Sequence, residues 1–217
     1  MLAADQRVTA NDHRSERPLK ICLLGYRSNP FSGGQGIYIK YLSKALIEAG
    51  HQVDVISGEP YPELDIRVRL IKLPGLNLYK ANNPATAIRP KHLFSYTDFF
   101  EWLSMLTGGF AEPYTFGRRL VTYFKSHCPD YDIVHDNQSL SFGTLKLQDM
   151  GVPILTTIHH PITRDLRIAL ANEESWYLRL LIRRWHSFLR MQKKVVKRLN
   201  HVVTVSEASR KDIARDF

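Results

Sequence analysis

The feature that most constrains the fold of this chain is a short buried strand, followed directly by a glycine-rich loop and an amphipathic helix. The apolar run over residues 19–24 ends at Gly25 and is typical of a strand covered on both faces. After the loop, apolar residues recur at helical spacing up to Gly50, a residue type common at left-handed helix caps. The predicted buried face of this helix carries Ile37, Tyr41, Leu42, Ala45, Leu46 and Ala49. With a second strand over residues 52–57, the opening predicts a βαβ unit.

The alternation of strands and helices continues along the chain. Further strands are predicted over residues 66–73, 132–136, 154–158 and 201–205, and helices over 94–106, 113–127, 142–150, 176–199 and 206–217. This alternation predicts an α/β fold with a doubly wound, mainly parallel sheet and helices on both faces. Residues 1–18 are polar and lack an apolar leader segment, which predicts a disordered tail. Residues 19–217 are expected to form a single Rossmann-like domain.

Gly33, Gly34 and Gly36 stand where the first helix begins. The first N–H groups of a helix lack partners within it and the helix dipole is positive there, so the main chain alone can hold an anion or a sugar hydroxyl. Glycine lets a ligand approach that backbone closely. A loop that only turns the chain is the alternative. The spacing matches neither the dinucleotide-binding G-x-G-x-x-G pattern nor a P-loop.

Other candidate residues follow the remaining buried strands, because ligands bind at the carboxyl ends of parallel strands. They are residues 135–137 and the segment His159-His160-Pro161. Neighbouring histidines can bind a metal, but no carboxylate or third histidine stands at ligand spacing, and adjacent side chains diverge on an extended backbone. No metal site is predicted. Cys22 and Cys128 have neither metal spacing nor that of a disulfide framework, which favours a reducing compartment.

The net charge of +9 favours anionic partners: phosphorylated ligands, an acidic membrane surface or nucleic acid. The helix predicted over residues 176–199 concentrates this charge. Its basic arc holds Arg179, Arg183, Arg190, Lys194 and Lys197, and its apolar face holds Leu178, Leu181, Trp185, Phe188, Val196 and Leu199. We expect the apolar face to pack on the core and the basic face to be either solvated or seated on an anionic membrane. Nucleic-acid binding is not expected, because no reading module or aromatic platform is found.

The most aromatic part of the sequence covers residues 93–124. Core packing against the sheet would explain most of these rings, and an apolar acceptor pocket is the alternative. No apolar run approaches the roughly 18 residues that a spanning helix needs, so any membrane contact is expected to be peripheral. The resulting expectation is a cytoplasmic protein that can associate with the inner face of the membrane.

Four segments resemble the amino-terminal domain of retaining glycosyltransferases of the two-Rossmann-domain (GT-B) type, specifically family 4. They are GGQGIYIKYLSKALIEAGHQVDVIS at 33–57, PDYDIVHDNQSL at 129–140, VPILTTIHHP at 152–161 and HVVTVSEASRKDI at 201–213. Each is loose alone, but together they keep the family's order, and from first to last they span most of residues 19–217. The resemblance implies a transferase with a nucleotide-sugar co-substrate, UDP- or GDP-linked, and no metal cofactor.

The resemblance also implies site residues. The family's glycine loop lies near the acceptor and the donor diphosphate, and Gly33, Gly34 and the adjacent Gln35 match it. The histidine of its T-x-H pattern contacts the transferred sugar or the acceptor, which makes His159 the expected catalytic residue. Its imidazole would donate to a sugar hydroxyl or steady developing charge. Further acceptor or phosphate contacts are expected of Asn137, His160 and Arg164.

One family feature is missing, because no two glutamates stand at the E-x7-E spacing of the donor-binding domain. The expectation is therefore an acceptor-binding half, which transfers a sugar with retention of configuration only together with a donor-binding domain or subunit. Alone, it is expected to be inactive. The aromatic stretch and the basic helix point to a lipid-linked acceptor. The alternative function is a non-catalytic Rossmann-like binding or interaction module.

Overall fold

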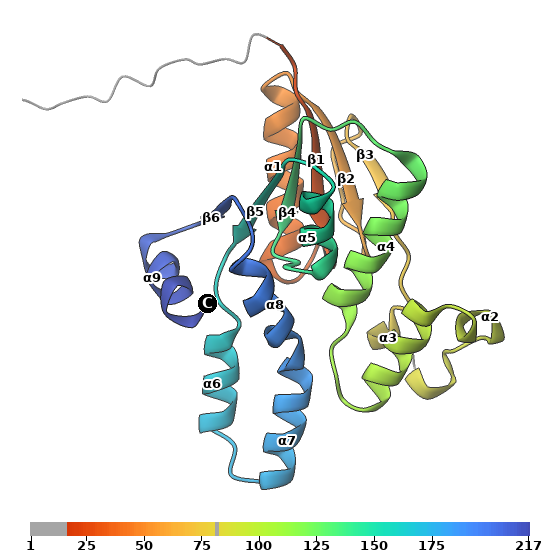
Figure 1. The fold of residues 1–217 in the computed structure, drawn as a ribbon, viewed down its shortest axis with the longest axis vertical. Helices are drawn as coiled ribbons and strands as arrows, with labels where there is room; N and C mark the ends of the chain where they lie inside the picture. The colour runs from red at the N-terminus through yellow and green to blue at the C-terminus, as the bar shows by residue number, and fades with distance from the viewer. Residues whose placement is uncertain (1–16, 81–82) are drawn as a thin grey trace, which may run out of the picture.

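The computed structural model describes residues 17–80 and 83–217 (Figure 1). Most of the predicted tail, residues 1–18, lies outside these ranges. Within them, six strands form one sheet in the order β3-β2-β1-β4-β5-β6, and every pairing is parallel. The strands are β1 (Lys20–Gly25), β2 (Gln52–Ser57), β3 (Arg69–Lys72), β4 (Ile133–Asn137), β5 (Ile154–Ile158) and β6 (Val202–Thr204). The strand order reverses between β1 and β4, so the predicted doubly wound parallel sheet is confirmed.

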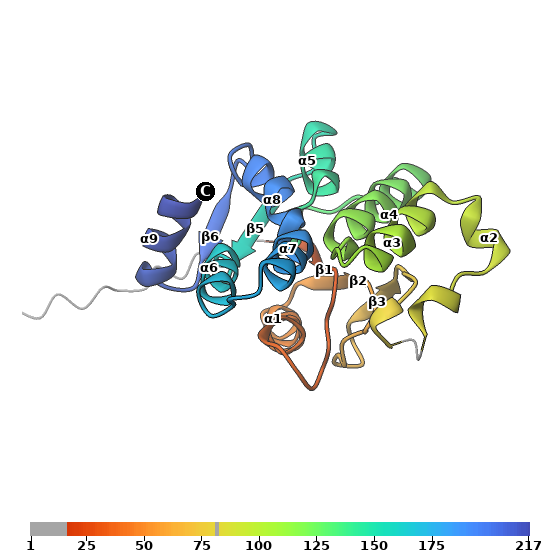
Figure 2. The ribbon, with the colours of Figure 1, turned by 90° about the horizontal axis from the view of Figure 1, so that it is seen from below.

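Helices fill the connections between the strands. They are α1 (Gly34–Glu48), α2 (Pro90–Leu93), α3 (Tyr96–Leu106), α4 (Glu112–His127), α5 (Phe142–Asp149), α6 (Thr163–Ala171), α7 (Trp176–Trp185), α8 (Leu189–Val196) and α9 (Glu207–Asp216). Short 3₁₀ turns cover Leu78–Lys80, Pro84–Thr86 and His186–Phe188. Figure 2 shows α1 on one face of the sheet and α4, α5 and α8 on the other, as the predicted covering of both faces requires.

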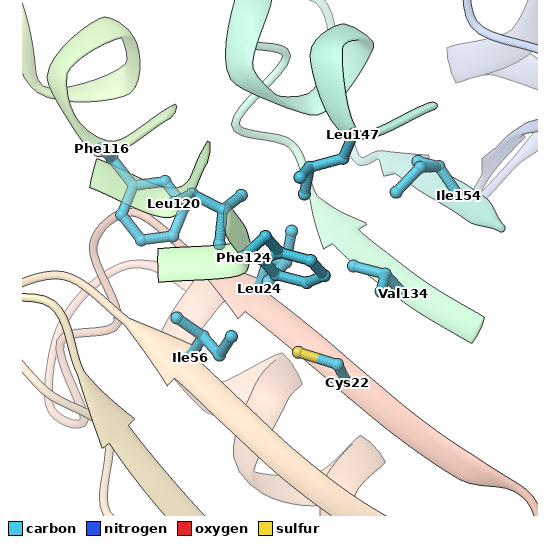
Figure 3. Close-up of a cluster of buried hydrophobic side chains, with 9 residues drawn as sticks. All are labelled: Cys22, Leu24, Ile56, Phe116, Leu120, Phe124, Val134, Leu147 and Ile154. Carbon is cyan, nitrogen blue, oxygen red and sulfur yellow. The ribbon is translucent and has the colours of Figure 1, made fainter. Parts of the chain in front are cut away.

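The uninterrupted apolar run of β1 follows from its place between two layers of helices. Cys22 and Leu24 belong to the cluster under α4 that Figure 3 shows, whereas Ile21 and Leu23 pack with Ile39 of α1. Successive side chains of a strand point to opposite faces of the sheet. A strand that is covered on both faces is therefore apolar at every position rather than at every second one.

The buried face of α1 differs from the predicted one. Gly36, Ile39 and Ser43 are the buried residues of this helix. Exposed instead are Ile37, Tyr41, Ala45 and Ala49. The rotation of the helix is set by Gly36, because a Cβ there would lie only 2.2 Å from the carbonyl oxygen of Asn29. Leu42 and Leu46 of the predicted face do pack, half-buried, against the core cluster that contains Ile39, so the prediction holds for these two residues and is wrong for the other four.

The helix predicted over residues 176–199 is interrupted, because the 3₁₀ turn His186–Phe188 separates α7 from α8. The predicted core packing holds for α8, which buries Val195 among other residues, but not for α7, which buries none. Leu178, Leu181 and Trp185 of the predicted apolar face are exposed. The reason is position: α7 packs on α6, and the two extend past the carboxyl edge of the sheet (Figure 1).

Two further predictions of burial hold only in part. Within residues 93–124, Phe116 and Phe124 of α4 lie in the core, but Phe94 is 92% exposed, because α2 and α3 lie beyond the sheet rather than over it (Figure 2). The strand predicted to be buried at 201–205 is β6, whose Val202 and Val203 are exposed. As the last strand of the sheet, β6 pairs with β5 alone.

α4 and α5 approach each other so closely that their contact requires glycine. A Cβ on Gly143 would lie 2.1 Å from the carbonyl oxygen of Gly117. We expect Gly143→Ala to lower the free energy of unfolding by about 2 kcal/mol, because a backbone atom cannot move aside as a flexible side chain would. Thermal unfolding followed by circular dichroism should show a Tm about 4–8 °C lower.

Gly34→Ala is the matched control, since Gly34 also stands at the start of a helix but a Cβ there meets nothing within 4 Å. Alanine favours a helix over glycine by up to about 1 kcal/mol, so this variant should keep or slightly raise the Tm. Equal Tm values for the two variants would contradict the steric requirement.

Candidate functional site

Three segments that are distant in the sequence meet at the carboxyl edge of the sheet. Asn137 ends β4, His159 follows β5, and the loop after β1 leads into α1. The Asn137 side chain joins them: its Nδ2 donates to the carbonyl oxygen of Gln35 at 3.1 Å, and its Oδ1 lies 2.6 Å from Nε2 of His159. The glycine loop and His159 therefore lie at the same edge, as predicted. It is the edge where ligands bind in doubly wound sheets, beside the reversal of strand order.

The contact with Asn137 determines which nitrogen of His159 carries the proton. An amide oxygen can only accept, so Nε2 of the neutral ring is protonated and Nδ1 keeps its lone pair. Burial, with a smaller contribution from His160, lowers the pKa of His159, and the ring is neutral at pH 7. Across residues 17–80 and 83–217, the one buried side-chain polar atom without a partner is Thr156 Oγ1, so the unpaired Nδ1 of His159 is open to solvent. His159 thus offers a hydrogen-bond acceptor.

His159 is held in place by contacts from three other segments. The backbone N–H of His159 donates to Gln138 Oε1 at 2.7 Å, and the carbonyl oxygen of His159 accepts from Ser209 Oγ at 3.0 Å. Tyr38 of α1 sets its ring edge-on to the imidazole, with centroids 4.7 Å apart. Sequence reasoning did not identify these three residues. Two of them are neighbours of residues that the sequence did single out: Gln138 follows Asn137, and Tyr38 follows Ile37 of the predicted helix face.

His135 of β4 lies beside this cluster. Its Nε2 is 2.6 Å from Oγ1 of Thr157, and its ring centroid is 6.3 Å from that of Tyr38. Burial, reinforced by the charge of His159, lowers the pKa of His135 to about 4. Near neutral pH the two imidazoles are therefore neutral polar groups, not cations that attract an anion.

The glycines of the loop divide into two kinds. Gly33 adopts φ +77° before the first residue of α1, and a Cβ on Gly33 or Gly34 would meet nothing within 4 Å. Gly36, in contrast, is required by close packing against the preceding loop. The backbone of Gly33 and Gly34 is thus open to a ligand, and the N-terminal N–H groups of a helix are located there.

The side chains of His160 and Arg164 make no hydrogen bond to Asn137 or His159, although the carbonyl oxygen of His160 accepts from Nε2 of Gln138 at 2.8 Å. Both side chains are exposed: Nε2 of His160 lies 3.3 Å from a carboxylate oxygen of Asp165, and Nη1 of Arg164 lies 3.9 Å from one of Asp212. Of the residues expected from the sequence, the structure therefore brings together Gln35, Asn137 and His159 and leaves these two at the periphery.

Metal binding has no visible site in the described part of the chain, where no group of three or more His, Cys, Asp or Glu side chains could hold an ion. Among those same residues, no helix has the length and apolar character needed to cross a lipid bilayer.

Comparison with known proteins gives matches over most of the chain. The profile of Glycosyltransferase Family 4 matches residues 32–217. The MMP alpha-(1->4)-mannosyltransferase of Mycolicibacterium hassiacum is 46% identical over 200 residues, which are 92% of this chain and 48% of that protein. The chain thus spans about half the length of this curated relative.

Two solved structures are distantly similar. LpCGTa in complex with UDP has a TM-score of 0.47 and 12% identity, with 92% of this chain and 49% of that chain covered. The glycosyltransferase SnogD from Streptomyces nogalater has a TM-score of 0.37 and 15% identity, with coverage of 88% and 45%. The family follows from the profile match instead, which covers more than half of the sequence: this chain belongs to glycosyltransferase family 4.

Proposed function

We propose that this chain is the acceptor-binding half of a retaining glycosyltransferase, which transfers a sugar from a nucleotide-sugar donor to a hydroxyl of a sugar acceptor. The observation that carries the proposal is the pair of hydrogen bonds made by Asn137. They place the accepting Nδ1 of a neutral His159 at the same edge as the open backbone of Gly33 and Gly34.

The two parts of the site suit different groups of the substrates. The backbone N–H groups at the start of α1 stabilise negative charge, such as that on a diphosphate, or bind an acceptor hydroxyl. His159 binds and orients a sugar hydroxyl by accepting a hydrogen bond from it at Nδ1. This role replaces the donating role that was expected from the sequence. His160 and Arg164 would contact the substrates from their exposed positions.

The proposal assigns no protein nucleophile. Asp136, which precedes Asn137, is fully buried, and its carboxylate accepts the backbone N–H groups of Ser139 and Leu140 at 3.2 and 3.1 Å. It closes the turn after β4 and does not face a substrate. Guidance of the incoming hydroxyl is left to the leaving diphosphate of the donor.

Mannose is the sugar we propose, because the curated relative is named a mannosyltransferase and is 46% identical over 92% of this chain. The donor would be UDP- or GDP-mannose. Its nucleotide is held by a donor-binding domain or subunit, since the described cluster offers no cation at its centre for the diphosphate. The alternative is a non-catalytic binding or interaction module, which would have the same fold and the same arrangement of Asn137 and His159 but would transfer no sugar.

We expect the 217-residue chain by itself to bind UDP- or GDP-mannose weakly, with a Kd of about 1 mM or above. Near neutral pH the site provides backbone dipoles and neutral imidazoles, which do not neutralise a diphosphate. Isothermal titration calorimetry measures this directly. Micromolar binding would show that the donor site lies within this chain and would overturn the division into halves.

We expect His159→Ala to lower kcat/KM of the enzyme completed by its donor-binding half by about 10²-fold, because a positioned hydrogen bond to the reacting sugar is lost. Radiolabelled transfer to the acceptor is the measurement. His127→Ala, which removes an exposed imidazole at the far end of α4, is the matched control and should retain full activity.

The pH profile tests the acceptor role. Because burial lowers the pKa of His159 below its ordinary value of 6.5, activity should be constant near neutrality and fall only as acid protonates Nδ1, below pH 6.5. Full activity of His159→Ala together with loss in His160→Ala would transfer the role to His160.

Membrane association is proposed for the outer end of α7. Trp176 is 74% exposed there, with Tyr177 and Leu180 also exposed and Arg183 close by in the sequence. The predicted basic arc is partly occupied, since Nη1 of Arg179 donates to the carbonyl oxygens of Leu170 and Glu173 and joins α7 to α6. Exposed tryptophan beside arginine suits the interface of an anionic bilayer. A lipid-linked acceptor would fit this placement.

We expect the chain to cosediment with vesicles of phosphatidylcholine and phosphatidylserine. Trp176→Ser should weaken this binding about tenfold, because it removes an aromatic ring that would be buried in the bilayer interface. Phe94→Ser is the matched control, because Phe94 is even more open to solvent than Trp176 but lies beside α2. Binding that ignores Trp176, or that is equal on uncharged vesicles, would contradict the proposal.

A further inference from the structure

Four aromatic side chains from three distant segments form a cluster at the inner end of α7. This aromatic cluster consists of Tyr79, Phe110, Trp185 and Phe188. Trp185 stacks on Phe110 with ring centroids 5.0 Å apart and meets Tyr79 edge-on at 5.4 Å, while Phe110 contacts Phe188 at 5.4 Å. The sequence predicted Trp185 to be part of a core-packed helix face. Its neighbours are instead rings contributed by loops.

The cluster is not sealed. Trp185 and Tyr79 each remain 38% exposed, although Phe110 covers one face of the indole. Neighbouring polar contacts hold the cluster in place: Nη2 of Arg184 donates to Thr107 Oγ1 at 2.8 Å and ties α7 to the end of α3, and the Tyr79 hydroxyl donates to the carbonyl oxygen of Gly109. These contacts hold the segments that carry Trp185 and Tyr79, so the exposed aromatic surface is preorganised for a ligand.

The aromatic cluster is continuous with the candidate site through the end of β1. Tyr26, which directly follows that strand, packs edge-on against Phe110 with centroids 6.2 Å apart. The same loop then leads through Gly33 and Gly34 into α1. The aromatic cluster and the glycine loop thus both adjoin the segment that leaves the carboxyl end of β1.

A charged pair borders the exposed rings. Arg27 lies 5.6 Å from the centroid of Tyr79, and its Nη1 donates to both carboxylate oxygens of Glu112 at 2.9 Å. Nε and Nη2 of Arg27 make no hydrogen bond to the described residues, and the side chain is partly exposed. Free donors beside aromatic faces match a ligand that has both hydroxyl groups and an apolar face.

We propose that Tyr79 and Trp185 form a distal acceptor subsite, which binds a sugar ring one or more units away from the reacting hydroxyl. The C–H face of a pyranose packs on the exposed ring surface and buries apolar area, while the free Arg27 donors bind its hydroxyls. The acceptor is therefore an oligosaccharide. A hydrocarbon chain fits less well, because it would shield Nε and Nη2 of Arg27 from water without accepting a hydrogen bond from them. This inference rests on the proposed function for the identity of the acceptor as a sugar.

Calorimetric titration of the 217-residue chain with mannose, α-(1→4)-mannobiose and α-(1→4)-mannotetraose tests the subsite. Affinity should rise with length. Trp185→Ala should weaken binding of the tetrasaccharide about tenfold, the loss expected for one aromatic contact, and leave the monosaccharide unchanged. Phe94→Ala, which removes an exposed aromatic ring beside α2, is the matched control and should bind like wild type.

Tryptophan fluorescence keeps the test sharp if Trp185→Ala fails to fold. The chain has three tryptophans, and Trp185→Phe preserves an aromatic ring against Phe110. Mannotetraose should change the fluorescence of wild type and of Trp176→Phe but not of Trp185→Phe. A signal that persists in Trp185→Phe, or wild-type affinity that does not depend on length, overturns the proposal.

Transfer assays separate this inference from the proposed function. In the enzyme completed by its donor-binding half, Trp185→Ala should raise KM for the tetrasaccharide about tenfold and leave kcat nearly unchanged, because Trp185 does not touch the reacting atoms. Wild-type enzyme that transfers no sugar would refute the proposed function. Wild-type transfer combined with an unaltered KM in Trp185→Ala would refute the distal subsite alone.

Discussion

The parallel pairing of β1 with β2 on one side and β4 on the other is the constraint on which the rest of this structure depends. Ile21 of β1 stands opposite both Val53 of β2 and Ile133 of β4, so the three strands end at the same edge. This register brings the glycine loop and Asn137 together, and the hydrogen bond from Asn137 to the carbonyl oxygen of Gln35 joins them. A slip of one residue in β4 would turn Asn137 to the face covered by α4 and α5, away from Gln35 of α1.

The electrostatics of the edge follow from what is buried there. Desolvation keeps His135 and His159 neutral, and Asn137 satisfies the protonated nitrogen of His159. Positive potential at this point comes from the start of α1, because the first backbone N–H groups of any helix have no partner within the helix. Most basic side chains lie elsewhere, so the candidate site is polar and uncharged near neutral pH.

α7 shows how one helix serves two environments. Its inner end places Trp185 among rings from the loops before α2 and α4, while its outer end exposes Trp176 far from the sheet. The 3₁₀ turn His186–Phe188 marks the boundary between α7, which buries no residue, and α8, which packs on the core.

The strands were largely predictable from the sequence, because a strand that is covered on both faces is apolar over most of its length, as β1 is over residues 21–24. The placement of candidate residues after the strands followed from the parallel sheet. Periodicity could not reveal the rotation of α1, the break before α8 or the exposure of α7, since each depends on which surface lies opposite. Likewise, the proton position on His159 and the rings around Trp185 arise from contacts between segments far apart in the sequence. The local pattern of side chains thus determined the elements, and tertiary packing decided which of their faces are buried and which remain open to a ligand.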